Sequence, residues 1–179
     1  MPAANRRLLT RSLCAAVATV VLITPARAQA PQVAVVFAPA LTEKFELYGE
    51  DEAAVLRSAI VTAVARATAG QPVPAGLLLT VIVQDVEPTR PTRAQAAADP
   101  TLDIFRTKYL GGARLTGELR DASQRLLTTV SYRYYPVDIK FGSVSRDPWA
   151  DARLAIDQFA VELAAACRDP GLKAASVPR

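Results

Sequence analysis

Hydrophobic residues recur along this chain with two different periods, and each period predicts a type of element. Residues 33–38 (VAVVFA) form a β-branched and aromatic run between two prolines, which predicts a buried strand. Residues 77–86 predict a longer strand with apolar side chains on both faces, so we expect it in the middle of a sheet. One face of that strand is expected to carry Leu77, Leu79, Val81 and Val83, and the other Leu78, Thr80, Ile82 and Val86.

Two further segments, residues 114–120 and 126–135, alternate apolar and polar side chains in the manner of half-buried strands. The short stretch between them, residues 121–125, suits a hairpin loop. We therefore expect an antiparallel hairpin with one apolar face and one face in water.

Two segments repeat apolar residues every three or four positions and predict helices. The first is expected to start at Asp51, whose carboxylate would accept a hydrogen bond from a free backbone N–H, and to end at Gly70. Residues 40–50, which precede it, are expected to be irregular. The apolar stripe of this helix is Leu56, Ile60, Val64 and Ala67.

The second helix is expected to start at Asp147, with Pro148 in its first turn, and to stop at residues 169–171. Its apolar stripe is Trp149, Ala152, Ile156, Phe159, Leu163 and Cys167. The polar side chains expected to face water are Asp151, Asp157, Gln158 and Glu162.

The order of these elements, β-α-β-β-β-α, predicts an α+β fold built as a two-layer sandwich. The first strand–helix–strand unit favours a parallel pair, and the hairpin adds antiparallel strands, so the sheet should be mixed. Both helices are expected to pack on one face of this sheet, which leaves the other face wet.

The first residues of the chain have the layout of a secretory signal peptide. Three arginines precede an apolar run from Leu13 to Ile23, and small residues follow with cleavage expected after Ala28 or Ala30. The run is about half the ~20 apolar residues that a membrane span requires. Lipidation at Cys14 is excluded because the apolar run follows the cysteine instead of preceding it. General and twin-arginine export both remain open.

Three parts of the chain follow from this layout: a signal peptide at 1–28, a single α+β domain at 29–171 and a flexible tail at 172–179. The protein is expected in the periplasm, with a membrane involved only in export. The full chain has 21 Lys+Arg against 17 Asp+Glu, and loss of the four arginines of residues 1–28 would leave 17 of each. A balanced chain of this kind does not favour a nucleic-acid partner.

The residue types exclude several mechanisms. The chain has no histidine, which removes the common Ser-His-Asp and Cys-His mechanisms and the commonest zinc ligand. Cys167 is the one cysteine outside the signal peptide, and its place on the apolar stripe indicates a buried, inert thiol. No catalytic residue, metal site or cofactor is therefore predicted.

Residues 88–112 are long for a connection inside a compact domain. Short helical turns are expected around 93–98 and 101–108. The segment carries four basic side chains that are the candidate ligand-binding residues, suited to a phosphate or carboxylate: Arg90, Arg93, Arg106 and Lys108. The alternative is a solvated loop whose basic residues are balanced by Asp99 and Asp103, two acids that would share a proton if buried together.

Aromatic residues gather at two places. Tyr132 and Tyr134 are expected on the core side of their strand, whereas Arg133 and Tyr135 point to the other side, which weakens a stacking platform for a ligand. Trp149, beside Pro148, is expected to fill the core.

Several segments of the second half of the chain resemble a group of small exported bacterial proteins of unknown function. They are PTRPTRAQ, DPTLD, LGGARLTGELRDASQRLL, SYRYYPVDI and WADARLAIDQFAVEL, and the first strand and helix resemble the group more loosely. The resemblance implies a signal peptide followed by one α+β domain. It implies no activity, because none is assigned to the group.

These observations favour a non-enzymatic periplasmic or envelope-associated binding or assembly protein. Its partner would be another envelope protein, contacted through a sheet edge or the 88–112 loop. One alternative is a small-molecule carrier with an apolar pocket between helices and sheet. Another is a carboxylate-based hydrolase, which needs two acids about 5 to 10 Å apart in a cleft. The candidate acids are Asp85, Glu87, Asp99 and Asp103.

Overall fold

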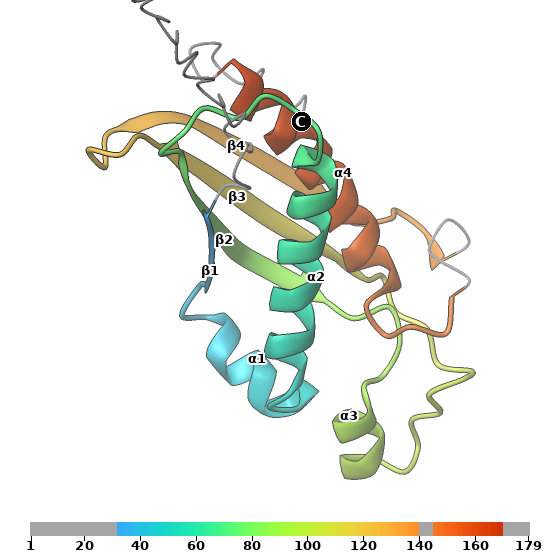
Figure 1. Ribbon diagram of the computed structural model, residues 1–179. Helices are drawn as coiled ribbons and strands as arrows, with labels where there is room; N and C mark the ends of the chain where they lie inside the picture. Colours follow the sequence, from blue (N-terminus) through green and yellow to red (C-terminus); the bar gives the residue numbers. More distant parts are fainter. Residues whose placement is uncertain (1–31, 140–144, 170–179) are drawn as a thin grey trace, which may run out of the picture.

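The computed structural model of the chain describes residues 32–139 and 145–169 (Figure 1). The expected signal peptide with its cleavage sites and the expected tail at 172–179 lie outside these ranges.

Four strands form one mixed sheet. They are β1 (Gln32–Phe37), β2 (Leu78–Glu87), β3 (Gly112–Arg120) and β4 (Leu126–Tyr134), and they lie side by side in chain order. β1 and β2 run parallel, whereas β2–β3 and β3–β4 are antiparallel. The parallel first unit, the central position of β2 and the hairpin are therefore confirmed.

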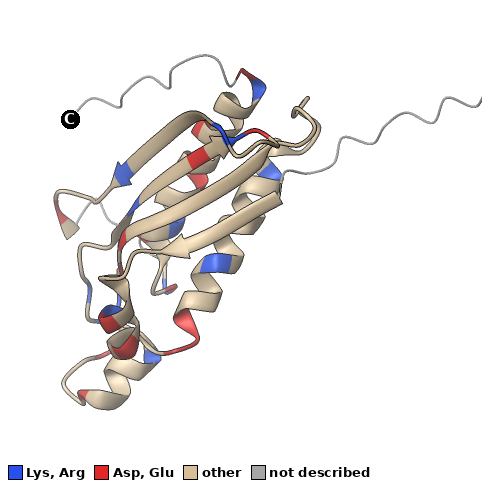
Figure 2. Cartoon of the chain, turned by 90° about the vertical axis from the view of Figure 1, so that its left-hand side faces the viewer, with Lys and Arg blue, Asp and Glu red and all other residues tan. Residues whose placement is uncertain are grey.

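Two long helices cover one face of this sheet. They are α2 (Glu52–Thr68) and α4 (Ala150–Arg168), and they pack against each other. α2 also contacts β1, and α4 contacts β3 and β4. Figure 2 shows the opposite face of the sheet in front of the two helices. The predicted α+β fold with two helices on one face of a mixed sheet is confirmed.

The core lies between this helical layer and the sheet. The inward side chains of β2 and β3 and the predicted stripe of α4 are almost fully buried there: Leu79, Val81, Val83, Leu115, Leu119, Trp149, Ala152, Ile156, Phe159, Leu163 and Cys167. The strand and helix periods of the sequence thus identified both sides of this interface correctly.

A glycine in β3 allows α4 to come close to the sheet. A Cβ atom at Gly117 would lie 2.6 Å from Cδ1 of Leu163 and 3.0 Å from Cζ of Phe159. Both of these side chains are fully buried, so neither has open space to move into.

Residues 40–50, expected to be irregular, contain a helix, and that expectation was wrong. This helix is α1 (Leu41–Tyr48), which buries Leu41, Phe45 and Tyr48. It ends at Gly49, whose φ of 116° is open to glycine but strained for other residues. In Figure 1, α1 and the short helix α3 (Arg93–Ala98) lie at the lower end of the sandwich.

The starts of the two long helices differ from the prediction. Asp51 precedes α2, but its side chain caps nothing, because its backbone is already helical and its carbonyl accepts the N–H groups of Ala54 and Val55. α4 begins at Ala150, three residues after the predicted start. Asp147 forms a turn before α4 by accepting the N–H of Trp149 on its carboxylate.

Asp151 was expected to face water, and this was wrong. Its exposed fraction is 0% because the first turn of α4 packs against the segment that follows β2. Its N–H donates to Oγ1 of Thr89 in that segment, at 3.1 Å.

β2 contains a bulge that the sequence pattern did not predict. The register against β3 shifts between Val83 and Asp85, so that Gln84 is an extra residue. Val86, expected on the outer face, is therefore buried on the same side as Val83. Beyond the bulge, the side chains of Asp85 and Glu87 lie on the outer face of the sheet. There Asp85 is directly opposite Arg114 of β3 in the strand register.

Substituting Gly117 tests the close contact between α4 and the sheet. We expect Gly117→Ala to lower the free energy of unfolding by about 1–3 kcal/mol, because the added methyl overpacks a fully buried site. Urea denaturation followed by Trp149 fluorescence measures this change. The isosteric change Thr129→Val on the exposed side of β4 is the control, expected within about 0.5 kcal/mol of wild type. Equal stability of Gly117→Ala and wild type would contradict the packing described.

Candidate functional site

The two acids placed outward by the bulge meet a lysine of α1. Nζ of Lys44 lies 2.8 Å from Oδ1 of Asp85 and also contacts Oε1 of Glu87. Lys44 and both acids are half-buried, so water only partly screens these contacts. The lysine therefore fastens α1 to the end of β2.

Two tyrosines complete this arrangement. Oη of Tyr48 donates to Oε2 of Glu87 at 2.7 Å, and Oη of Tyr135 donates to Oδ2 of Asp85 at 2.6 Å. Each carboxylate thus accepts one hydrogen bond from a tyrosine hydroxyl and one from the ammonium group of Lys44, which the two carboxylates share. We call these five residues, Lys44, Tyr48, Asp85, Glu87 and Tyr135, the carboxylate network.

The charges of the network are stabilised by its own contacts. Burial would raise the pKa of Asp85, but hydrogen bonds from Lys44 and Tyr135 outweigh it and hold this pKa below its usual range. Burial would likewise lower the pKa of Lys44, and the two carboxylates outweigh that effect and raise it. Burial and then a carboxylate partner raise the pKa of both Tyr48 and Tyr135, so both phenols stay protonated.

This electrostatic state counts against the hydrolase alternative. General acid–base hydrolysis with paired acids needs one carboxyl group protonated near neutral pH. Asp85 is held ionised, and a lysine occupies the space between Asp85 and Glu87. Asp85 is therefore poorly suited to be the protonated acid of such a pair.

Asp99 is exposed, Asp103 is half-buried, and the two belong to separate turns. Asp99 accepts hydrogen bonds from both the N–H and the hydroxyl of Thr101, and Asp103 accepts from the N–H groups of Phe105 and Arg106. These bonds lower the pKa of each carboxyl group. The two acids are therefore not a buried pair that shares a proton.

The four basic residues singled out from the 88–112 segment lie in different surroundings. Arg90 is buried and donates to the carbonyls of Ser145 and Phe105, at 2.8 and 2.6 Å. Arg106 is 91% exposed, with Asp103 at 3.8 Å. Arg93 is exposed at the start of α3, and Lys108 is half-buried. That these four side chains bind an anion stays a prediction. The two hydrogen bonds of Arg90 show that this side chain holds the segment together.

This segment is fixed to the body at several points. Thr92 caps α3 in a capping box with Gln95, and its hydroxyl also donates to the carbonyl of Tyr48 at 2.6 Å. The N–H of Thr89 donates to the carbonyl of Pro148 at 2.7 Å. The helical turn expected at 93–98 is confirmed as α3, whereas residues 101–108 form turns without a helix.

Within the described ranges, no helix covers the outer face of the sheet (Figure 2). We call this surface the open face. Its middle is nearly free of charge, and charged residues lie toward the strand ends. Its side chains are mostly small or polar, and the larger aliphatic ones are Val36, Leu78 and Ile82. The others are Ala34, Thr80, Thr116, Glu118, Thr129 and Ser131. Val36 is 49% exposed, which leaves apolar area in contact with water.

The tyrosine-rich end of β4 divides between the two faces as predicted. Tyr132 and Tyr134 pack against the core. Arg133 and Tyr135 lie on the open face, with Cζ of Arg133 5.3 Å from the centre of the Tyr135 ring. The core position of Trp149 is also confirmed, because it is buried and its Nε1 donates to Glu52 at 2.6 Å.

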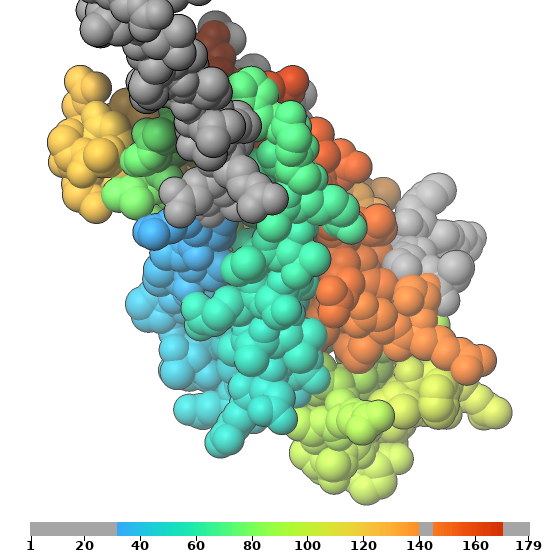
Figure 3. All heavy atoms as spheres, viewed as in Figure 1, coloured from blue at the N-terminus to red at the C-terminus, as the bar shows by residue number. Residues whose placement is uncertain are grey.

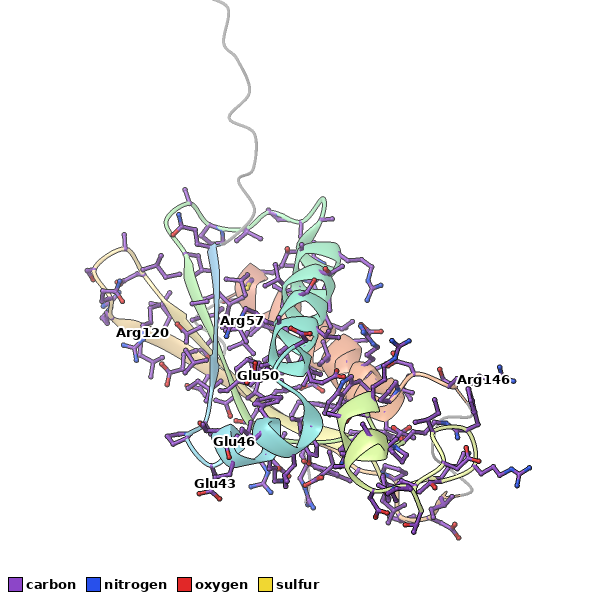
Figure 4. All side chains as sticks on the ribbon, turned by 90° about the horizontal axis from the view of Figure 1, so that it is seen from below. Glu43, Glu46, Glu50, Arg57, Arg120 and Arg146 are labelled. Carbon is purple, nitrogen blue, oxygen red and sulfur yellow. The ribbon has the colours of Figure 1, made fainter. Side chains whose placement is uncertain are left out.

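The β1 edge of the sheet is partly closed. Nη1 of Arg57 donates to the carbonyl of Val35 at 2.6 Å, and Cζ of Arg57 lies 5.2 Å from the centre of the Phe37 ring. Figure 4 shows Arg57 beside this strand, with Glu43 and Glu46 on α1. Because a side chain already uses a carbonyl of this edge, strand addition there would have to displace it.

A shallow groove of about 620 Å³ runs between α2 and α4, on the side away from the sheet (Figure 3). Small side chains of α2 line it, and an ion pair of 2.6 Å between Arg66 and Asp157 crosses it. The carrier alternative expected a pocket between the helices and the sheet. Core side chains fill that interface, which weakens the carrier.

Comparisons with known proteins add little. No family model and no curated protein matches the chain. A solved structure, a minor lipoprotein from Acinetobacter baumannii, is 12% identical with a TM-score of 0.30, and the match covers 83% of this chain and 98% of that chain. A likeness of this size bears on neither fold nor function.

Two general features of the described residues limit the possible sites. None of their helices has both the length and the apolar composition needed to cross a membrane. No three or more of their Asp, Glu and Cys side chains are grouped so as to hold a metal ion.

Replacing Asp85 tests the carboxylate network. We expect Asp85→Asn to lower the free energy of unfolding by about 1 kcal/mol at neutral pH, because Lys44 and Tyr135 lose an ionised partner that is only partly screened. Denaturation at a series of pH values measures the loss.

The pH dependence of this loss has a defined sign. The pKa of Asp85 is lower in the folded state than in the unfolded chain, so its contribution is complete above about pH 4 and disappears as the pH falls through the folded value. The gap between wild type and Asp85→Asn should therefore close in acid. Glu46→Gln, an exposed acid of α1, is the control with the same charge change and should lose little. A gap that grows in acid would contradict the assignment.

Proposed function

We propose that this protein is an exported, non-enzymatic binding or assembly protein of the cell envelope, and that the open face of its sheet is the contact surface. The observation that supports the proposal most is the asymmetry of the sheet. Two helices cover one face, whereas the other is left without a covering element in the described part of the chain.

The chemistry of the open face suits a flat partner. The side chains in the middle of this face are short, so another surface can come close to the sheet there without displacing long side chains. Val36 and Ile82 provide apolar area, and the hydroxyls of Thr116 and Ser131 lie beside it, 3.2 Å apart. Interfaces commonly combine an apolar centre with polar groups of this kind.

The 88–112 segment, the second contact surface expected from the sequence, is held by Thr89, Arg90 and Thr92 in a fixed arrangement. It presents Phe105, which is 62% exposed and lies 5.6 Å from the guanidinium of Arg146. This segment can therefore extend a contact surface.

Export to the periplasm rests on the signal-peptide layout of the first residues. The thiol of Cys167 agrees with an oxidising compartment, because it is fully buried and burial raises its pKa to about 11. A thiol of this kind neither forms unwanted disulfides nor reacts quickly with oxidants.

Counting thiols tests export and cleavage together. The whole chain has two cysteines, Cys14 and Cys167, and the expected cleavage removes Cys14. Protein isolated from the periplasm of its host should therefore react with one equivalent of a thiol reagent after denaturation, and with almost none while folded. Intact mass measurement gives the cleavage position, with the protein made without export as the control. Two reactive thiols and an intact amino terminus would refute the export proposal.

Site-specific photocrosslinking in the host tests the open face. A photoreactive amino acid at Val36 or Thr129 should give discrete crosslinked products, because both positions are exposed on this face. The matched control is Val161, which is 60% exposed on the outer side of α4. Identical products at the control position, or none at either open-face position, would contradict the proposed contact surface.

A further inference from the structure

Two arginines lie directly opposite each other at one end of the open face. Arg114 of β3 and Arg133 of β4 are register partners, and both are exposed. Directly opposed side chains on antiparallel strands have Cβ atoms about 4.5–5.5 Å apart, and like charges in this position destabilise the pair. The position is therefore costly for the protein alone unless a negative group lies between the two guanidinium groups.

The nearest acid does not bond to either arginine. Asp85 is the register partner of Arg114 on the other side, and the charge of Arg114 contributes to its lowered pKa. Both oxygens of Asp85 already accept hydrogen bonds, from Lys44 and from Tyr135. Within residues 32–139 and 145–169, neither Arg114 nor Arg133 has a hydrogen-bonded acid.

This end of the sheet thus carries three positive side chains, Lys44, Arg114 and Arg133, and the two carboxylates of the network. Lys44 is shared between Asp85 and Glu87, which leaves the surplus charge on the exposed arginine pair. This part of the open face is consequently a place where an anion gains attraction and removes a repulsion at the same time.

Neighbouring groups shape the position. The Tyr135 ring, on which Arg133 stacks, is held by its hydrogen bond to Asp85, so the carboxylate network orients one side of the arginine pair. On the other side of the arginine pair, Thr116 and Ser131 are the next register partners on the open face, two residues further along each strand. Their hydroxyl groups lie 3.2 Å apart. Planar guanidinium forks and hydroxyl groups together suit an oxygen-rich anion.

We infer that Arg114 and Arg133 form a binding site for a phosphate group on the open face. A carboxylate has two oxygens, which a single guanidinium fork satisfies, whereas a phosphate monoester has three and can accept from two forks. The inference deepens the proposed contact surface by naming the chemistry that it recognises, and it does not depend on export. The phosphate can belong to a soluble molecule or to a lipid headgroup.

Inorganic phosphate is the first probe. In a titration of the purified protein at low ionic strength, the side-chain Nε–H signals of Arg114 and Arg133 should shift together in NMR spectra and give one dissociation constant. Arg114→Gln or Arg133→Gln should weaken binding about tenfold, the loss expected for a hydrogen bond to a charged group. Arg168→Gln, an exposed arginine in the last turn of α4, is the matched control and should leave binding unchanged.

A second measurement covers effects of the substitutions on folding. Phosphate should raise the thermal midpoint of the wild-type protein above that in sodium chloride of equal ionic strength. Without phosphate, Arg133→Gln should melt no lower than wild type, because it removes a repulsion. Equal shifts of all exposed arginines, equal binding of acetate, or equal loss in Arg168→Gln would overturn the inference.

Two arms distinguish the sources of the phosphate. One uses glycerol 3-phosphate, and the other uses phosphatidylcholine vesicles with and without phosphatidic acid. Binding in either arm that is lost in Arg114→Gln supports the site and names its source, whereas binding in neither overturns it. The outcome of photocrosslinking from Val36 and Thr129 does not depend on the outcome of the phosphate titration. Phosphate binding without crosslinks would therefore support this site and contradict only the proposed macromolecular partner.

Discussion

The extra residue at Gln84 sets the direction of every side chain that follows it in β2. Without this bulge, Val86 would point outward and Asp85 would point into the core, where an ionised carboxylate is very costly. With the bulge, Val86 is buried and Asp85 and Glu87 reach Lys44, Tyr48 and Tyr135. The position of α1, the orientation of the Tyr135 ring and the surroundings of Arg114 all depend on this register shift.

The two faces of the sheet are built for different tasks. The inner face carries branched apolar side chains and one glycine, which together allow α2 and α4 to pack closely. The outer face carries short side chains in its middle and charged ones at its ends. The hydrophobic core thus lies on one side of the sheet, and the middle of the other face can vary in its chemistry without loss of that core.

The sequence was informative where periodicity acts over a single element. Strand alternation and the helical stripe identified the inward residues of β3, β4 and α4, and those of β2 as far as Val83, because burial on one side imposes these periods directly. α1 was missed although Leu41, Phe45 and Tyr48 have helical spacing, because eight residues are too few for a clear pattern. Asp151 was misassigned because its burial comes from the segment after β2, which is distant in the sequence.

The carboxylate network was largely beyond sequence reasoning for the same reason. Asp85 and Glu87 were noticed as crowded acids, but Lys44 and Tyr135 lie far from them along the chain, and only the folded sheet brings these groups together. A bulge leaves no reliable trace in an alternating pattern, because one extra polar residue reads as a continuation of the strand. The one available signal was the spacing of three residues between the apolar Val83 and the apolar Val86, which strict alternation would place on opposite faces.

The parallel pairing of β1 with β2 also bears on how quickly the protein folds. Gln32 pairs with Leu78 across a connection that contains α1 and α2. Strand pairs of such wide sequence separation raise the contact order and slow folding, because the entropy of loop closure is lost before the contact stabilises the chain. If the proposed export uses the general route, in which a chain crosses the membrane unfolded, a slow search of this kind would lengthen the interval in which translocation is possible.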